Sequence, residues 1–278
     1  MTQVSKRDAL GDRMKSRYED VTRLRLPART YTILRVDGRA FHTWTRGLDK
    51  PYDLSFMACM DATAAALCEE IAGARFAFVQ SDEISLLATD FADVATQAWF
   101  DGNLQKWASV AASVATVAFN AKVGHYNVAR DGTTLLGLKK PDATFDARVF
   151  TIPDHIEVEN YFVWRQNDAV RNSVTMLAQH YASHKQLHGK GREQQHEVIH
   201  AHGDNWASHP ARFKHGAVIR KLGAAEWGED LGEQPREENY SVGNWFVDGK
   251  TPVFTRNWEY LRRMIPIHWE DDIIERVK

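Results

Sequence analysis

The sequence predicts an α+β fold with the ferredoxin-like order βαββαβ, and three observations support this prediction. Residues 30–37, "TYTILRVD", form a short apolar run rich in β-branched side chains, as expected of a buried strand. Two further apolar runs flank the polar "QSDE" within residues 75–89, which is typical of a hairpin. Residues 97–121 have a helical pattern rich in alanine, which favours close packing on a sheet.

Two more elements complete this order. Asp53 is well placed to cap a helix that carries apolar residues from Phe56 to Ile71 and ends at Gly73. The run "ARVFTIP" at 147–153 closes the series as another strand. In chain order the elements are strand, helix, strand, strand, helix, strand. A charged helical pattern over about residues 5–24 precedes them.

The composition favours a soluble protein of the reducing cytosol. The 278 residues carry a formal charge of −2, so no global positive field indicates a nucleic-acid binder, and a polyanion would have to meet a local basic patch. Cys59 and Cys68 lie in an apolar helical pattern, which indicates buried thiols rather than a disulfide. There is no apolar signal-peptide core or bilayer-spanning run, so we expect cytoplasmic localisation and no membrane partner.

The pattern changes after Pro153. A long amphipathic helix is predicted over residues 155–184, followed by the cationic "KQLHGKGR", a short helix to about residue 200 and an irregular C-terminal third with small strands and turns. We therefore predict an N-terminal helix plus core at 1–153. A helical and C-terminal extension at 154–278 is expected to pack on it as one integrated domain.

Asp37 and Asp82 are the first candidates for a functional site. In the βαββαβ topology the first strand leaves the sheet at the edge where the hairpin turns, so these two carboxylates should converge although 45 residues separate them. Acidic turns are common, and two ordinary turns are the alternative. Acids gathered at one edge, including Glu83, repel one another unless a cation neutralises them. This favours a site for Mg²⁺.

The turn after the first strand continues as "GRAFH", from Gly38 to His42. Its backbone N–H groups could form a nest for phosphate oxygens, with Arg39 and His42 adding charge or hydrogen bonds. Lys50 follows at the mouth of the same edge, and Lys106 lies on the second helix of the core, where it could project towards phosphates. A solvated surface position is the alternative for Lys50, and snorkelling is the alternative for Lys106.

Polar and basic residues beyond the core are candidates for contacts with RNA or a second nucleotide. Arg165, Asp168 and Asn172 share a helix face because they lie three or four positions apart. A basic cluster follows, for which a solvated surface is the alternative: Lys185, His188, Lys190, Arg192, Arg212, Lys214, Arg220 and Lys221. No zinc spacing, P-loop, GxGxxG or GxSxG motif occurs.

Five motifs in order resemble those of a known family: "RVDGRAFHTW", "DKPYD", "QSDEISLL", "FDARVFTIP" and "YFVWRQNDAVRN". They are similar to the successive motifs of the tRNA-His guanylyltransferase family and its relatives, the guanylyltransferase-like 3′→5′ polymerases. The match covers about residues 30–200 and, weakly, a later "RFKHGAVIRK". The resemblance implies a polymerase palm with added helices and a small C-terminal β-containing extension.

The resemblance also implies roles for individual residues. Asp37, the carbonyl of Gly38, and Asp82 would hold two Mg²⁺ ions, and the catalytic acids would be Asp37, Asp82 and Glu83. The positions implied for nucleotide binding are Gly38, Arg39, Ala40, Phe41, His42, Lys50, Asp53, Ser81 and Lys106. The positions implied on the helix beyond the palm are Arg165, Gln166, Asp168 and Asn172. The basic cluster, independently of the resemblance, predicts RNA contacts from Lys185, Lys190 and Arg192.

The implied activity is template-dependent 3′→5′ nucleotide addition to the 5′ end of tRNA, a repair reaction of a Mg²⁺-dependent nucleotidyltransferase. Family members activate a 5′-monophosphorylated tRNA with ATP or GTP. The 3′-hydroxyl of an incoming nucleotide then attacks the activated phosphate, with two ions stabilising the attacking and leaving oxygens. The implied partners are tRNA, nucleoside triphosphates and further copies of the chain in a tetramer or dimer.

One departure concerns the substrate. Eukaryotic members that act on tRNA-His have His-Ile-Asn-Asn where this chain has "VRNS", Val170 to Ser173. The difference favours the broader relatives that extend 5′-truncated tRNAs. The alternatives are a tRNA-His-specific guanylyltransferase, a palm-type nucleotide cyclase without an RNA substrate, and a catalytically idle RNA-binding module.

Overall fold

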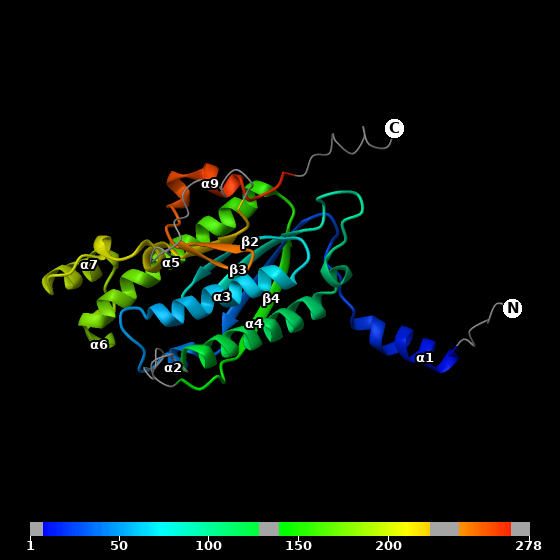
Figure 1. Ribbon diagram of the computed structural model, residues 1–278, viewed down its shortest axis with the longest axis horizontal. Coiled ribbons are helices and arrows are strands. Elements are labelled where there is room, and N and C mark those ends of the chain that lie inside the picture. Colours follow the sequence, from blue (N-terminus) through cyan, green and yellow to red (C-terminus); the bar gives the residue numbers. More distant parts are fainter. Residues whose placement is uncertain (1–7, 128–138, 223–238, 268–278) are drawn as a thin grey trace.

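The computed structural model describes residues 8–127, 139–222 and 239–267 and is built around one antiparallel sheet (Figure 1). Its strand order is β4-β1-β3-β2-β5-β7-β6. The strands are β1 (Tyr31–Gly38), β2 (Ala74–Gln80), β3 (Glu83–Thr89), β4 (Phe145–Ile152), β5 (Ala217–Arg220), β6 (Asn239–Val242) and β7 (Trp245–Asp248). The first four in this order, β4-β1-β3-β2, are the ferredoxin-like palm.

The predicted palm order is confirmed, because α3 (Leu54–Glu70) joins β1 to β2 and α4 (Leu104–Asn127) joins β3 to β4. The Asp53 carboxylate caps α3 by accepting from the Phe56 N–H at 2.9 Å. Helix α4 begins later than predicted. A short 3₁₀ turn at Trp99–Gly102 precedes it, with Phe100 and Asp101 in the left-handed region, and these two residues interrupt the helical pattern.

The two faces of the sheet are covered by different helices. Leu34 and Val36 of β1 pack with residues of α3 and α4, such as Met60 and Phe119. Tyr31 and Ile33 point to the other face and pack with Phe162 of α5 (His155–Tyr181). This alternation follows from the period of two in a strand, and it places Arg35 and Asp37 on the α5 face.

The C-terminal extension continues the palm sheet through β5, β7 and β6. Its helices are α6 (His184–Leu187), α7 (Arg192–Ala201), α8 (Ala211–His215) and α9 (Trp258–Arg262). A buried ion pair links the extension to the palm, since Arg212 of α8 contacts Asp61 of α3 at 2.7 Å. Arg212 is only 8 % exposed, so its predicted place in a solvent-facing basic cluster was wrong.

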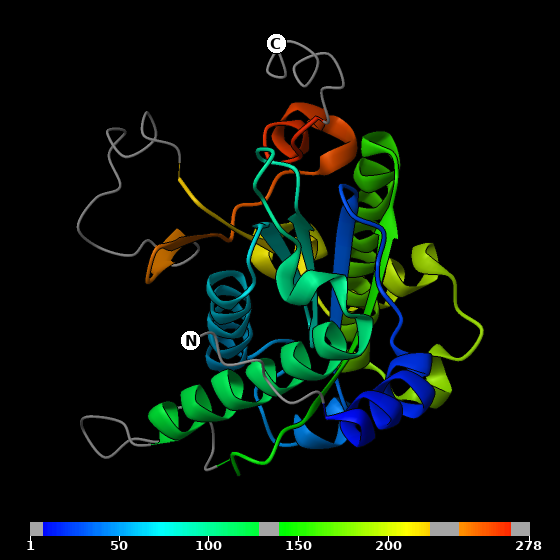
Figure 2. The same ribbon diagram turned by 90° about the vertical axis from the view of Figure 1, so that its right-hand side faces the viewer.

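The N-terminal helical segment projects from the body (Figures 1 and 2). It consists of α1 (Ala9–Met14), a π-type turn at Lys15–Glu19 and a 3₁₀ turn at Asp20–Thr22. The predicted helix over about 5–24 is therefore present as three short helical pieces within the described residues. None of the helices described here is long and apolar enough to cross a membrane.

Candidate active site

The end of β1 and the turn of the β2–β3 hairpin meet at one edge of the sheet. Asp37 is the register partner of Glu83, and the Gly38 N–H donates to the Asp82 carbonyl at 3.0 Å. Asp37 and Asp82 thus lie at the same edge, as the topology predicts. The hairpin turn is tight, with Ser81 in the left-handed region at φ 47°.

Asp82 is in an environment that disfavours its charge. Burial raises the pKa of this carboxyl, and the neighbouring charges of Asp37 and Glu83 raise it further. Hydrogen bonds from its own backbone and from the Ser81 side chain act in the opposite direction but do not cancel these effects. A divalent cation beside Asp82 would relieve both the desolvation and the repulsion.

Asp37 is neutralised by arginines. Its Oδ2 atom lies 3.0 Å from Nη2 of Arg148 and 3.3 Å from Nε of Arg35. Arg148 comes from β4 and is half exposed, whereas Arg35 lies two residues before Asp37 on the same face of β1. Neither arginine was singled out from the sequence, although the alternation of β1 and the pairing of Arg35 with Arg148 across β1 and β4 could have located both.

Glu83 is held by ion pairs instead of facing the edge. Arg165 of α5 donates to both carboxylate oxygens, at 2.7 Å and 2.6 Å, and Arg35 contacts Oε2 at 2.8 Å. Glu83 is 6 % exposed. Both oxygens of this predicted catalytic carboxylate are thus paired with arginines, and its role in catalysis stays a prediction. Glu83 instead anchors the turn that carries Asp82.

The same geometry encloses Arg165, for which an RNA contact is predicted. Its side chain is 4 % exposed and also contacts Asp168 at 2.8 Å, and the RNA contact stays a prediction. Gln166 is likewise internal, bonding the carbonyl of Pro252 and the N–H of Phe254. Asn172 is exposed and lies one turn further along α5.

The loop after β1 is shaped by an aromatic cluster. Phe41 is 3 % exposed and packs against Trp44, Phe119 and Phe145. A Cβ atom at Gly38 would lie 2.4 Å from the Phe41 ring, so only glycine fits there. The Phe41 side chain therefore belongs to the core, and only its backbone could serve a ligand. Arg39, Ala40 and His42 are exposed beside it.

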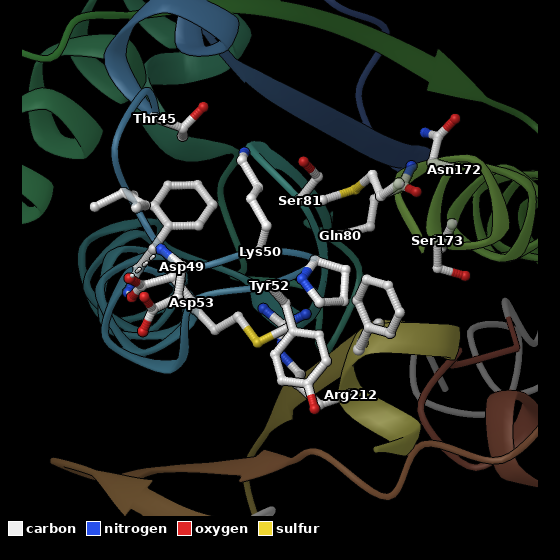
Figure 3. Close-up of a pocket in the computed structure, with 18 residues that line it drawn as sticks. Thr45, Asp49, Lys50, Tyr52, Asp53, Gln80, Ser81, Asn172, Ser173 and Arg212 are labelled. Carbon is white, nitrogen blue, oxygen red and sulfur yellow. Dashed lines mark hydrogen bonds between the residues drawn. The ribbon is translucent and has the colours of Figure 1, made fainter. Parts of the chain in front are cut away.

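A cleft opens next to this edge (Figure 3). It brings together residues predicted to contact a nucleotide or RNA, among them Lys50, Asp53, Ser81 and Asn172. Lys50 extends into the space between Thr45 and Ser81. Arg212 of the predicted basic cluster also lines the cleft. Sequence reasoning assigned no role to Tyr52 and Phe213, which line it too, although they lie within "DKPYD" and "RFKHGAVIRK".

The oxygens of Asp53 bond within the chain. They accept from the Phe56 N–H at 2.9 Å and the Asp49 N–H at 3.3 Å. The carboxylate is thus fixed at the N-terminus of α3, on the wall of the cleft.

Two groups of predicted residues lie away from the site. Lys106 is in the first turn of α4, next to Phe100 and at the end of the sheet where β3 ends, opposite to Asp37. The structure therefore does not place Lys106 at the sheet edge where Asp37 and Asp82 of the same chain lie. Lys185, Lys190 and Arg192 are on or between α6 and α7, which pack on α5 beyond the cleft.

The sequence model of the tRNAHis guanylyltransferase family matches residues 11–153, about half of the chain and all of the palm. The chain belongs to this family. The membership confirms the resemblance found in the motifs, and it makes the chain a nucleotidyltransferase of mixed α and β structure.

Individual relatives are similar to most of the chain. An uncharacterized protein of Acanthamoeba polyphaga mimivirus is 30 % identical over 231 residues, covering 77 % of each chain. The tRNA(His) guanylyltransferase of Schizosaccharomyces pombe is 28 % identical over 232 residues, 77 % of this chain and 84 % of that protein.

Solved structures of the family extend the match in space. A bacterial tRNA(His) guanylyltransferase-like protein, solved in complex with ATP, has a TM-score of 0.76 at 36 % identity and covers 93 % of this chain and 100 % of that one. The enzyme of Saccharomyces cerevisiae, at 22 % identity, shares the fold with a TM-score of 0.61, covering 76 % of this chain and 93 % of that one.

Proposed function

We propose that this protein adds nucleotides in the 3′→5′ direction to the 5′ end of tRNA, after activation of that end by ATP or GTP. The observation that carries the proposal is the position of Asp37 and Asp82 at one sheet edge, beside a cleft that Lys50, Ser81 and Asn172 line. The bacterial relatives solved with ATP and with GTP support nucleotide substrates.

The residues at the edge fit Mg²⁺. Among the residues that the structure describes, no group of three or more His, Cys, Asp or Glu side chains is arranged to hold a metal. Mg²⁺ does not need one, since it is commonly bound by one or two carboxylates together with substrate phosphates and water. Asp37, Asp82 and the Gly38 carbonyl would supply that set, and the raised pKa of Asp82 indicates a place where a cation is favourable. When bound, two ions would stabilise charge on the attacking and leaving oxygens.

The protein residues then position the reactants. Lys50 would bind phosphate oxygens of a nucleotide in the cleft, and the backbone of the Gly38–His42 loop would approach the same phosphates. Glu83, clamped by Arg165, keeps the turn of Asp82 in place. The 3′-hydroxyl of the incoming nucleotide would attack the activated 5′ phosphorus of the RNA, forming the new P–O bond and releasing the activating group.

The substrate is proposed to be a 5′-truncated tRNA copied from a template, rather than tRNA-His alone. The departure "VRNS" supports this choice, because Asn172 and Ser173 lie on the wall of the cleft. The named function of relatives such as the S. pombe protein supports the tRNA-His alternative.

The deciding experiment incubates the protein with labelled nucleotide, Mg²⁺ and a 5′-truncated tRNA, with Asp82→Asn as the control variant. Lengthening of the tRNA by the wild type alone supports the proposal, and a comparison of tRNA-His with other truncated tRNAs and with altered templates separates the two substrate choices. A cyclic nucleotide formed without RNA would contradict it in favour of a cyclase. RNA binding without either product would indicate an idle module.

A further inference from the structure

A second cavity lies at the end of the sheet remote from Asp37. Its walls come from the start of β2, the end of β5 and the region of α9, and Figure 1 shows α9 on the opposite side of the molecule from α2 (Phe41–Trp44). The cavity encloses about 670 Å³, within the range of roughly 300–1,000 Å³ that is common for small-molecule sites. Four of its side chains are basic: Arg75, Arg220, Lys221 and Arg263.

Arg75 reaches this cavity from a β-bulge. The register between β2 and β3 shifts between Ala74 and Phe76, so Arg75 is the extra residue, and such bulges redirect a side chain. Its Nε–H donates to Oγ1 of Thr89 at 2.8 Å. This bond fixes one side of the guanidinium and leaves its two terminal nitrogens for another partner.

The two cations at the end of β5 are held over aromatic rings. Nζ of Lys221 lies 5.0 Å from the centre of the Trp245 ring, and Cζ of Arg220 lies 5.5 Å from that of Phe246. Cation–π contacts of this kind position a charge without neutralising it. The ring of Trp245 therefore places the charge of Lys221 in the cavity.

Acidic side chains are scarce in this cavity. Glu259 is the one carboxylate in its described lining, and it pairs with Arg263 at 3.4 Å between two well-exposed side chains, where ion pairs are weak. Within the described part of the chain, neither Arg75 nor Lys221 has an ion pair. Burial lowers the pKa of Arg75, so the guanidinium loses hydration without gaining an opposite charge.

We propose that this cavity binds a phosphate group. Arginine forks match phosphate oxygens in a bidentate way, and lysine adds a point charge. The phosphate could belong to the backbone of the RNA substrate, in which case the inference rests on the proposed function, or to a free oligophosphate. Both sources share the same chemistry, and the experiment separates them.

The second cavity is too far from the sheet edge of Asp37 for one small ligand to bind at both places. Gln80 at the hairpin lies five positions after Arg75 along β2, roughly 17 Å at the usual rise of a strand. A nucleotide held at Asp37 does not reach that far along the sheet, whereas a polymer could occupy both places. An RNA that binds at both ends of the sheet would gain affinity from each phosphate contact.

The test compares wild type with Arg75→Gln/Lys221→Gln, and uses Lys15→Gln/Arg17→Gln as a control that removes the same charge outside the cavity. The probes are a 5′-monophosphorylated, 5′-truncated tRNA transcript, followed by fluorescence anisotropy over a salt series, and inorganic tripolyphosphate, followed by thermal shift. We expect the cavity variant to raise the Kd for RNA by about tenfold and to lower the salt slope by about two, one unit for each lost phosphate contact. Arg263→Gln, at an exposed position, repeats the test if the double variant folds poorly.

Each outcome decides something. Weaker RNA binding only in the cavity variants assigns the phosphate to RNA, and loss of only the tripolyphosphate-induced shift assigns it to a free oligophosphate. Affinity, slope and thermal shift equal to those of the control double variant would overturn the inference. Nucleotide addition is measured alongside: if the wild type adds none while the cavity variants still weaken RNA binding, the proposed function fails and the phosphate site stands.

Discussion

Two carboxylates that are neighbours in the chain have opposite surroundings in this protein. Glu83 is enclosed by Arg35 and Arg165 beneath α5, with every oxygen paired. Asp82, in the hairpin turn, has a raised pKa because it is buried near Asp37 and Glu83. The network beneath α5 thus supplies its own cations, and Arg35 and Arg148 pair with Asp37, whereas none of the described residues forms an ion pair with Asp82. Under the proposed function, Glu83 would stabilise the fold around the hairpin turn and Asp82 would serve the reaction.

The largest expected effect comes from removing an edge carboxylate. Asp82→Asn and Asp37→Asn should each reduce nucleotide addition by at least about 10³-fold, because the bound ions provide several kcal/mol of transition-state stabilisation. The measurement is single-turnover extension of a 5′-truncated tRNA at saturating Mg²⁺. Thermal unfolding is the control: Asp82→Asn should not lower stability, whereas Asp37→Asn should lower it slightly by removing one of the carboxylate partners of Arg35 and of Arg148. Near-normal turnover in both variants would remove the metal assignment.

The edge itself could be predicted from the sequence. The hydrophobic runs fix the strand order, and that order brings Asp37 and Asp82 together without any knowledge of side-chain packing. The position of Lys106 was also within reach of topology. The helix after β3 must start near the end of β3, which lies at the far end of the sheet from Asp37.

The pairing of Glu83 could not be predicted. Its partner Arg165 is 82 residues away, and their contact depends on how α5 lies across the sheet, which short-range patterns do not determine. The same applies to Arg212, which looked like part of a basic surface until its contact with Asp61 appeared. The order of β5, β7 and β6 was equally hidden, because strands of four residues carry little periodicity.

The next largest effect is expected in the network beneath α5. Arg165→Met should lower the free energy of unfolding by about 3 kcal/mol, because it leaves a buried carboxylate short of its main partner. Urea denaturation measures this. Arg171→Met is the matched control, since Arg171 also pairs with Asp168 but is 65 % exposed, and such a pair contributes about 0–1 kcal/mol. Equal losses in the two variants would show that Glu83 does not need Arg165.

A smaller effect is expected for Lys50 in the cleft. Lys50→Ala should raise the KM for the nucleotide about tenfold, equivalent to about 1.4 kcal/mol of binding, with the fold and the Mg²⁺ dependence unchanged. Lys250→Ala removes a lysine outside the cleft and should leave both constants as they are. If the two variants behave alike in steady-state assays, Lys50 is a surface residue and the nucleotide binds elsewhere along the edge.

The smallest effect concerns the pH dependence of stability in the absence of metal. The folded-state pKa of Asp82 is raised above its ordinary value of 3.8. Folding therefore favours the protonated carboxyl. The resulting contribution to the free energy of unfolding is fully present at a pH below the ordinary pKa, and it is lost as the pH rises through the folded-state pKa. The side chain at position 82 of the Asp82→Asn variant cannot ionise, so the variant does not lose stability in this way. In EDTA the stability of the variant relative to wild type should therefore increase between the ordinary pKa and the folded-state pKa of Asp82, and then level off at higher pH.

Saturating Mg²⁺ should reduce this advantage of Asp82→Asn near pH 7, since a ligand that binds only the folded wild type stabilises it by mass action. Chemical denaturation of both proteins from pH 3.5 to pH 7, with EDTA or with Mg²⁺, measures the difference. If the stability difference between the variant and wild type does not change with pH, Asp82 is paired with a cation of the chain itself, as Glu83 is. The contrast between the two neighbouring carboxylates would then disappear, and the metal would have to be sought at Asp37 alone.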